Sequence, residues 1–449
     1  MMQNAKNMYI LSGTEAFTRG ELDNVAITEN GVCLEQAAGR HVLYGCFTSP
    51  VVSLPAFDRL VMSWNAETPP GTVVEAQARV QVADGWSAWQ SFGKWSPYIP
   101  RASESGDAAQ PVYMLKNVLH IDTGKAVGAQ LRIYLYTDDE RLTPRVWLLA
   151  ASVRPVDWRP APAAPYSRML RLPAYSQKLR DPQLQAGMSA PVTLASLLNR
   201  WGLDVLPEEL AQAVFDHGAA NPRNFSFAAA LAGCYGYRAY LAYAEPEDLW
   251  QCIKQGYSVG VFMRYSADAE QARQQNKAFL PGAFGDVEAQ MMALRGFEVG
   301  PGGSFALVND SLAATNDQAE KAYPLEPFWQ AYQGLALVIP GRQKGRGEGC
   351  PHRRRARLRA LEQVGAYLFS SDSGQDLPLP ADFAGTLACT VQQEAVYATT
   401  AHKQFRFLSP TASGGVQLPP ELFSQKGRIT VYAIGTDGCT LVGDVNLPG

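Results

Sequence analysis

The chain has 449 residues, of which 47% are hydrophobic and 18% are charged, and its formal net charge is −3. This length and composition predict a folded protein of about three domains, and the negative charge argues against nucleic acid as a partner. No apolar run reaches the roughly 20 residues of a membrane-spanning helix, and the seven cysteines lack the spacing of a disulfide framework. The first eight residues lack the apolar core of a signal peptide, so a cytoplasmic protein is expected, or a secreted one if a leader has been trimmed off.

Residues 1–155 are predicted to form an antiparallel β-sandwich. Polar and apolar residues alternate over residues 73–82 and 131–136, as they do in strands with one buried face. Turn residues such as Pro69 and Gly71 lie nearby.

Tryptophans cluster in this first domain, at Trp64, Trp86, Trp89 and Trp95. If they stack on sugar rings, the domain is a glycan-binding or adhesion module. They can equally fill the core of the sandwich or the interface with the next domain.

A proline-rich connector at residues 154–165 favours an extended joint, and residues 166–340 are predicted to form a second domain. Helices are expected near residues 190–201, 207–215 and 226–234. Strands are expected near residues 257–265, 290–297, 304–309 and 335–339. Helices followed by a sheet are typical of an α+β domain.

The first of these helices is predicted to start near Ser189. Apolar residues recur at spacings of three and four from Leu194 to Trp201, and Gly202 ends the pattern. Pro191 is tolerated in the first turn. Unpaired N–H groups at such a helix start can lower the pKa of a nucleophilic thiol, although Ser189 could also be a simple N-cap.

The second domain contains six short motifs: Tyr175-Ser176-Gln177, Met188-Ser189-Ala190-Pro191-Val192-Thr193, Asn224-Phe225-Ser226-Phe227, Ala289-Gln290-Met291, Arg295-Gly296-Phe297 and Val308-Asn309-Asp310. In order and spacing they resemble the double-glycine, or bacteriocin-leader-processing, branch of the papain-like cysteine peptidases, in its stand-alone multidomain bacterial form. The resemblance covers about residues 51–340. It implies an α+β papain-like cysteine-peptidase domain preceded by the β-sandwich.

The resemblance also implies a role for four residues: oxyanion amide for Gln177, nucleophile for Ser189, base for Gln290 and base-orienting carboxylate for Asp310. The family typically has Cys at the nucleophile position and His at the base position. A Ser hydroxyl needs an adjacent base, and the carboxamide of Gln290 cannot accept its proton in the working pH range. Together with Met188 in place of Trp, these two changes favour natural degeneration over an engineered Cys-to-Ser change.

His217 is the histidine of this domain, and it is predicted to be a solvated or capping loop residue, because a papain-like base comes from a later strand. Cys234 and Cys252 are expected to be buried structural thiols. Residues 276–286 contain Gly and Pro just before Gln290, which predicts a loop over the active-site cleft.

A second joint follows Pro340, and residues 352–359 form a strongly basic run. This run could contact an acidic polymer or phosphate, but a solvated linker and helix start is favoured. Residues 362–449 are predicted to form a small C-terminal β domain, because residues 428–433 alternate like a strand. An immunoglobulin-like fold is one option for it.

Three functions are open at this stage. The favoured one is a catalytically degenerate cysteine-peptidase-like protein that binds a peptide or protein partner in the former active-site cleft. The alternatives are an active peptide hydrolase and a glycan-binding protein that uses the Trp-rich sandwich. Whether the chain is an enzyme therefore stays open, and no motif indicates a cofactor or a metal.

Overall fold

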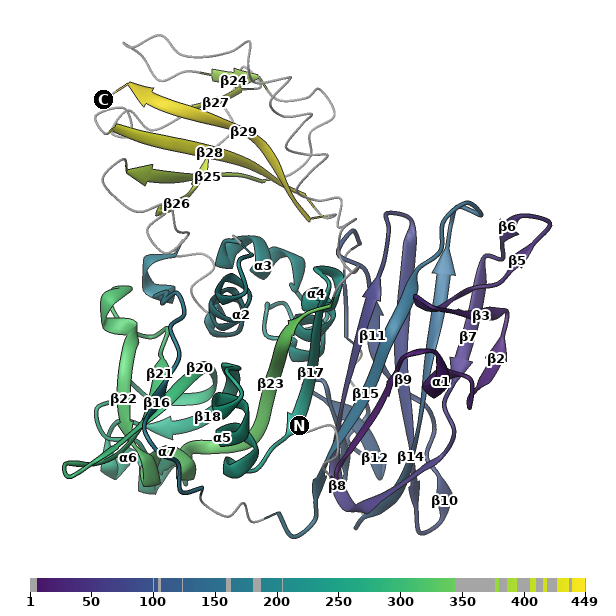
Figure 1. Cartoon of the computed structure of the whole chain (residues 1–449), viewed down its shortest axis with the longest axis horizontal. Coiled ribbons are helices and arrows are strands. Elements are labelled where there is room, and N and C mark those ends of the chain that lie inside the picture. Colours follow the sequence, from purple (N-terminus) through teal and green to yellow (C-terminus); the bar gives the residue numbers. More distant parts are fainter. Residues whose placement is uncertain are drawn as a thin grey trace.

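The computed structural model describes residues 6–343, with gaps at 100, 104–105, 123, 159–162, 181–186 and 204, and six strands beyond them. Across these residues the chain is mostly β with a few helices. Figure 1 shows an N-terminal sheet beside a mixed region of helices and strands.

The N-terminal region forms one sheet of thirteen strands. They are β1 (Met8–Ser12), β2 (Glu21–Asp23), β3 (Val25–Thr28), β4 (Gly31–Leu34), β7 (Tyr44–Thr48), β8 (Val52–Glu67), β9 (Thr72–Val82), β10 (Gly85–Trp86), β11 (Gln90–Trp95), β12 (Val112–Leu115), β13 (Val118–Ile121), β14 (Ala126–Thr137) and β15 (Arg145–Pro155). Helix α1 (Thr14–Phe17) and the small hairpin of β5 (Gln36–Ala37) and β6 (Arg40–His41) accompany them.

This sheet curls until it is nearly closed. Strand β14 pairs with β9 from Gly128 to Thr137, and its start also pairs with the start of β8. Alternate residues of β14, among them Leu131, Ile133 and Leu135, are fully buried inside. The predicted antiparallel strands are confirmed, but they belong to one nearly closed sheet, whereas a sandwich has two separate sheets.

The middle region contains an eight-stranded sheet with the order β17-β23-β18-β20-β21-β22, flanked by β16 and β19. Its strands are β16 (Arg168–Met169), β17 (Tyr237–Tyr243), β18 (Val259–Ser266), β19 (Ala278–Phe279), β20 (Val287–Gly300), β21 (Gly303–Asn309), β22 (Glu320–Pro324) and β23 (Tyr332–Arg342). Its helices are α2 (Ser189–Arg200), α3 (Pro207–Ala213), α4 (Phe225–Cys234), α5 (Pro246–Lys254), α6 (Ala269–Gln274) and α7 (Leu325–Ala331), with 3-10 turns η2 (Gln177–Leu179) and η3 (Asp317–Ala319). Every helix and strand predicted for this region is present, and α2, α3 and α4 precede β17, the first long strand of the sheet. The papain-like layout itself remains a prediction.

The two regions share one continuous hydrophobic core. Helix α4 packs on β8, where the ring of Phe227 lies against Trp64 and Trp95 at centroid distances of 6.3 and 5.3 Å. Both tryptophans are completely buried. Trp64 and Trp95 therefore fill the interface between the two regions, as one of the two interpretations of the Trp cluster predicted.

Side chains of the N-terminal sheet also bind the free edge of β17. The backbone N–H groups of Ala239, Leu241 and Tyr243 donate to Asn65 Oδ1, Ser63 Oγ and Ser152 Oγ at 2.8–3.0 Å. An edge strand exposes unpaired N–H groups, which proteins cover. Here the neighbouring sheet covers them with buried polar side chains.

The C-terminal strands are β24 (Asp376–Pro378), β25 (Thr386–Gln393), β26 (Gln404–Leu408), β27 (Gly415–Gln417), β28 (Lys426–Gly435) and β29 (Gly438–Pro448). Four of them form a sheet with the order β26-β25-β28-β29, and β28 contains the predicted strand at residues 428–433. The second joint beyond Gln343 and the basic run at 352–359 lie outside the described residues. The boundaries of the three predicted domains remain predictions.

Candidate functional site

Helix α2 begins at Ser189 itself, and Met188 occupies the N-cap position. The turn into the helix uses Gly187, whose φ of +146° disfavours a side chain. Ser189 is 8% exposed, and its Oγ accepts a long hydrogen bond of 3.5 Å from the backbone N–H of Met291 on β20. The N-cap alternative for Ser189 is therefore wrong, and its hydroxyl faces β20 next to Gln290.

Gln290 lies near the start of β20 and is 3% exposed. Its Oε1 accepts a hydrogen bond of 2.6 Å from the hydroxyl of Tyr265 on β18. Its Nε2 donates a hydrogen bond of 2.6 Å to Asp310 Oδ1. Both ends of the carboxamide are thus engaged by residues other than Ser189.

Asp310 follows β21 directly and is completely buried. Besides the bond from Gln290, Oδ1 accepts from the backbone N–H of Leu312 at 2.9 Å, and Oδ2 accepts from the Tyr323 hydroxyl at 2.7 Å. Burial raises the pKa of Asp310, and these hydrogen bonds act against that rise. Burial also raises the pKa of Tyr265 and of Tyr323, and the nearby Asp310 carboxylate adds to both shifts, so both phenols stay protonated donors.

Gln177 begins the 3-10 turn η2, and two hydrogen bonds attach it to Ser311. Its backbone N–H donates to the Ser311 carbonyl at 2.8 Å, and its Oε1 accepts from the Ser311 hydroxyl at 3.0 Å. Since Oε1 is held, the Nε2 group is left as a donor, and it has no partner among the described residues. An oxyanion-binding amide would bind through such an Nε2 donor.

The structure thus brings the four predicted site residues to one place. Gln177 reaches the segment of Asp310 through Ser311, Asp310 holds Gln290, and Ser189 contacts the residue that follows Gln290. Within the described part of the chain, no hydrogen bond joins Ser189 to the side chain of Gln290.

Sequence reasoning missed Ser311, Tyr265 and Tyr323, which complete the hydrogen-bond network. Ser311 directly follows Asp310, so its position in the chain was a usable signal. The two tyrosines are brought in by neighbouring strands, and a single sequence does not reveal which of its buried phenols face a carboxylate.

His217 lies in an exposed loop, as predicted. Its backbone N–H donates to the Arg101 carbonyl at 2.7 Å, and its ring packs on Phe215. Cys234 and Cys252 are both buried, as predicted, and burial raises the pKa of their thiols to about 11 and about 12.

The segment 276–286 folds back on β18. The N–H of Leu280 donates to the Ser266 carbonyl at 2.9 Å, and Lys277 pairs with Asp286 at 2.6 Å. No hydrogen bond or ion pair of the described residues joins this segment to Ser189 or Gln290, so a loop over the cleft remains a prediction.

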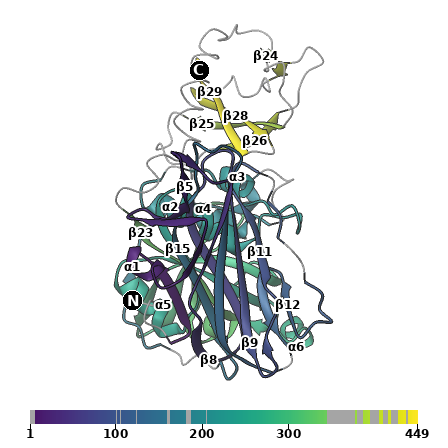
Figure 2. The same cartoon turned by 90° about the vertical axis from the view of Figure 1, so that its right-hand side faces the viewer.

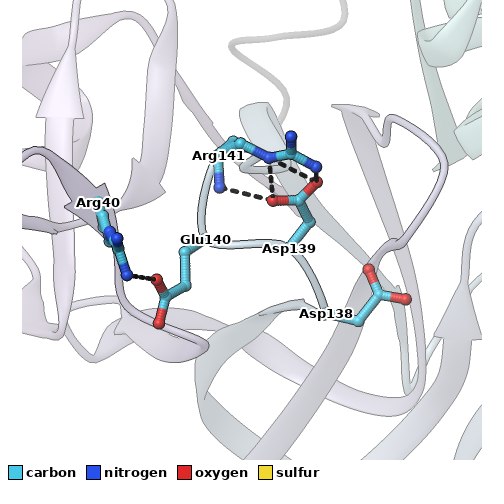
Figure 3. Close-up of a pocket in the computed structure, with 5 residues that line it drawn as sticks. All are labelled: Arg40, Asp138, Asp139, Glu140 and Arg141. Carbon is cyan, nitrogen blue, oxygen red and sulfur yellow. Dashed lines mark hydrogen bonds and ion pairs between the residues drawn. The ribbon is translucent and has the colours of Figure 1, made fainter.

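A separate open hollow of about 590 Å³ lies on the N-terminal sheet (Figure 3). It is lined by Arg40, Asp138, Asp139, Glu140 and Arg141. Arg40 pairs with Glu140 at 3.0 Å, and Arg141 pairs with Asp139 at 2.6 Å. The hollow holds no nucleophile, so it does not compete with the Ser189 site as a candidate catalytic centre.

No group of three or more His, Cys, Asp or Glu residues in the described ranges could hold a metal ion. The described helices are also too short or too polar to cross a membrane.

Residues 9–153 match the family model described as the Peptidase C39 N-terminal domain. No curated protein matches the chain. The matched segment is the nearly closed N-terminal sheet, so this finding does not depend on the motifs of the middle region. Over that sheet, the chain is similar to the N-terminal domain of C39 peptidases.

Proposed function

We propose that this protein is a catalytically degenerate relative of the C39 peptidases, which binds a peptide or protein partner at the site around Ser189. The observation that carries the proposal is the hydrogen bonding of Gln290. Its carboxamide is held between Tyr265 and Asp310 and makes no bond to Ser189 among the described residues. The relation of the N-terminal sheet to C39-like peptidases supports the peptidase ancestry.

Catalysis by Ser189 would require a group that accepts the hydroxyl proton. An amide oxygen has no pKa in the neutral range, and that of Gln290 already accepts from Tyr265. Asp310 is completely buried and accepts a hydrogen bond from Gln290, and His217 is held in its exposed loop at Arg101. An active hydrolase would therefore need a base that these residues do not supply.

Binding a partner needs only hydrogen-bond donors and acceptors, whereas catalysis also needs a group that accepts a proton. The Nε2 group of Gln177 and the hydroxyl of Ser189 can both donate to backbone carbonyls of an extended peptide. Ser189 keeps a small exposed fraction, and Gln177 is half-buried. These two residues are the proposed contacts with the partner.

The test is a peptide selection on the immobilised full-length protein, followed by affinity measurements for the enriched sequences. We expect Gln177→Ala and Ser189→Ala each to weaken binding about fivefold, because each removes a hydrogen bond worth about 1 kcal/mol. Gln255→Ala is the matched control, since Gln255 is exposed at the end of α5 and should leave binding unchanged. Failure to enrich any peptide, or enriched peptides that ignore both substitutions, would overturn the proposal.

A further inference from the structure

A loop of residues 216–224 packs on the turn that precedes Ser189. The loop leads into α4, and α4 lies beside α2 in both views of the molecule (Figures 1 and 2). A Cβ at Gly187, in the turn before α2, would lie 3.0 Å from Pro222 Cδ and 3.6 Å from Arg223 Nε. The guanidinium group of Arg223 therefore borders the turn that leads into Ser189.

Buried hydrogen bonds fix the backbone of this loop. The carboxylate of Asp216 is completely buried, and its Oδ1 accepts from the backbone N–H of Ser103 at 2.9 Å. Its Oδ2 accepts from Asn224 Nδ2 at 2.8 Å. The backbone N–H of Arg223 donates to Asn221 Oδ1 at 2.9 Å. The backbone of Arg223 is thus held on both sides along the chain, and its side chain extends from a fixed position.

The guanidinium group of Arg223 is available to a ligand. The residue is exposed, and its side chain makes no ion pair and no hydrogen bond with the part of the chain that the structure describes. The carboxylate of its own loop, Asp216, is buried and already accepts the hydrogen bonds described above. No described carboxylate of this loop therefore neutralises Arg223.

The other charged groups of the site do not neutralise Arg223 either. The charged side chains in residues 177–180, 187–191, 221–225, 288–291 and 309–311 are Lys178, Arg180, Arg223, Glu288 and Asp310. Glu288 pairs with two cations at 2.6 and 3.1 Å, and Asp310 is completely buried. Arg180 has a buried carboxylate partner of its own at 3.3 Å. Among the described residues, Arg223 thus adds an unbalanced positive charge beside Ser189.

One bound peptide can contact both Ser189 and Arg223. Gly187 and Ser189 are two residues apart, so their Cα atoms are separated by at most about 7 Å. Arg223 Nε lies 3.6 Å from the Cβ position of Gly187. Since an extended chain spans roughly 3.4 Å per residue, a peptide residue within about four positions of the one at Ser189 reaches the guanidinium group.

We propose that the partner bound at Ser189 carries a carboxylate that pairs with Arg223. The planar guanidinium group matches the geometry of a carboxylate and binds it through two hydrogen bonds. A charge at the rim of an interface mainly selects among partners. The carboxylate belongs either to an Asp or Glu side chain of the partner or to its C-terminus. This inference rests on the proposed binding of a peptide at Ser189 and adds the charge of that peptide.

The test is a selection from two synthetic peptide libraries on the immobilised full-length protein, one library with free C-termini and the other amidated. If a side chain supplies the carboxylate, Asp and Glu should be enriched in both libraries. If the C-terminus supplies it, only the library with free C-termini should yield binders. Each enriched peptide is then compared with its Glu→Gln, Asp→Asn or amidated counterpart. Wild type should bind the carboxylate form about fivefold more tightly, the size expected of an exposed ion pair.

Substitutions of Arg223 show whether this residue is responsible for the preference. Arg223→Gln should bind both forms of the peptide equally, Arg223→Lys should keep part of the preference, and Arg223→Glu should reverse it. Arg273→Gln is the matched control, because it removes an exposed arginine of α6 and should keep the full preference. Thermal unfolding checks that the variants remain folded.

Failure of this inference can be distinguished from failure of the proposed function. If wild type enriches no peptide, the proposed function fails, and this inference fails with it. If wild type enriches peptides without a preference for carboxylates, or if Arg223→Gln keeps the wild-type preference, only the pairing with Arg223 is overturned.

Discussion

At the scale of single residues, the side chain of Gln290 links two buried polar groups. A carboxamide has one acceptor and two donors, and it bonds a phenol at one end and a carboxylate at the other. All three groups are buried, where an unmatched polar atom costs about 1–3 kcal/mol. The hydrogen bonding of Tyr265 and Asp310 is thus satisfied by an amide that lacks the basicity needed for catalysis.

Asp310 should give the protein a measurable pH dependence. Burial raises the pKa of its carboxyl group, so the folded state binds this proton more tightly than the unfolded state. The contribution of this group to the free energy of unfolding is therefore fully present below the unfolded pKa of about 3.9. It is lost as the pH rises through the folded pKa. Asp310→Asn has nearly the same shape and no charge, and it should lack this loss.

We accordingly expect the stability of Asp310→Asn relative to wild type to increase as the pH rises above about 4. Urea unfolding at a series of pH values measures it. Asp84→Asn, at an exposed loop position, serves as the control and should show no such trend. If the difference in free energy of unfolding between Asp310→Asn and wild type stayed constant with pH, it would contradict the raised pKa of Asp310.

At the scale of elements, a strand can be predicted from alternating residues where one of its faces is buried and the other is exposed. It cannot be predicted in this way where both faces are buried. Strand β9 alternates buried and partly exposed residues along most of its length, and β14 does the same, and both were predicted from that pattern. Residues 60–66 of β8 are all buried, because α4 and β17 cover the outside of this strand. Alternation is lost there, so β8 could not be recognised from its pattern.

The candidate site could also be predicted in part from the sequence. The resemblance to the double-glycine peptidases implied that Gln177, Ser189, Gln290 and Asp310 share one site, and hydrogen bonds of these residues or of their chain neighbours link them in the structure. The C-terminal half of α2 carries an apolar stripe that a sequence can display. The hydroxyl donors to Gln290 and Asp310 come from other strands, and their pairing follows from sheet register, which no local pattern encodes.

The pairing of β16 with β20 requires a glycine at position 296. A Cβ there would lie 2.2 Å from the Arg168 carbonyl oxygen and 2.8 Å from the Met169 Cα. Gly296→Ala must therefore displace β16, which precedes the segment of Gln177, and we expect a loss of about 1–3 kcal/mol in the free energy of unfolding. Urea unfolding measures this loss.

Gly300→Ala provides the control in the same strand, because nothing lies within 4 Å of a Cβ at that position. It should change stability by no more than about 0.5 kcal/mol. Equal stability of the two variants would mean that β16 does not pack on β20 as described.

At the scale of the whole molecule, the N-terminal sheet and the middle region depend on each other. Asn65 is completely buried and bonds both the Ala229 carbonyl of α4 and the backbone of Ala239 on β17. Without the middle region, Asn65 and Trp64 would lie on an exposed surface of the sheet. The segment that matches the C39 N-terminal domain therefore also supports the scaffold that carries Ser189.

The central claim is that this scaffold carries a binding site without a working base, and proteolysis tests it most directly. Wild type and Ser189→Ala are incubated with a diverse peptide library that includes double-glycine sequences, and new termini are identified by mass spectrometry. A Ser189→Cys, Gln290→His double variant is the positive control, since Asp310 is placed to orient an imidazole at position 290. The account predicts no cleavage by wild type or by Ser189→Ala, whereas cleavage by wild type that disappears in Ser189→Ala would contradict it.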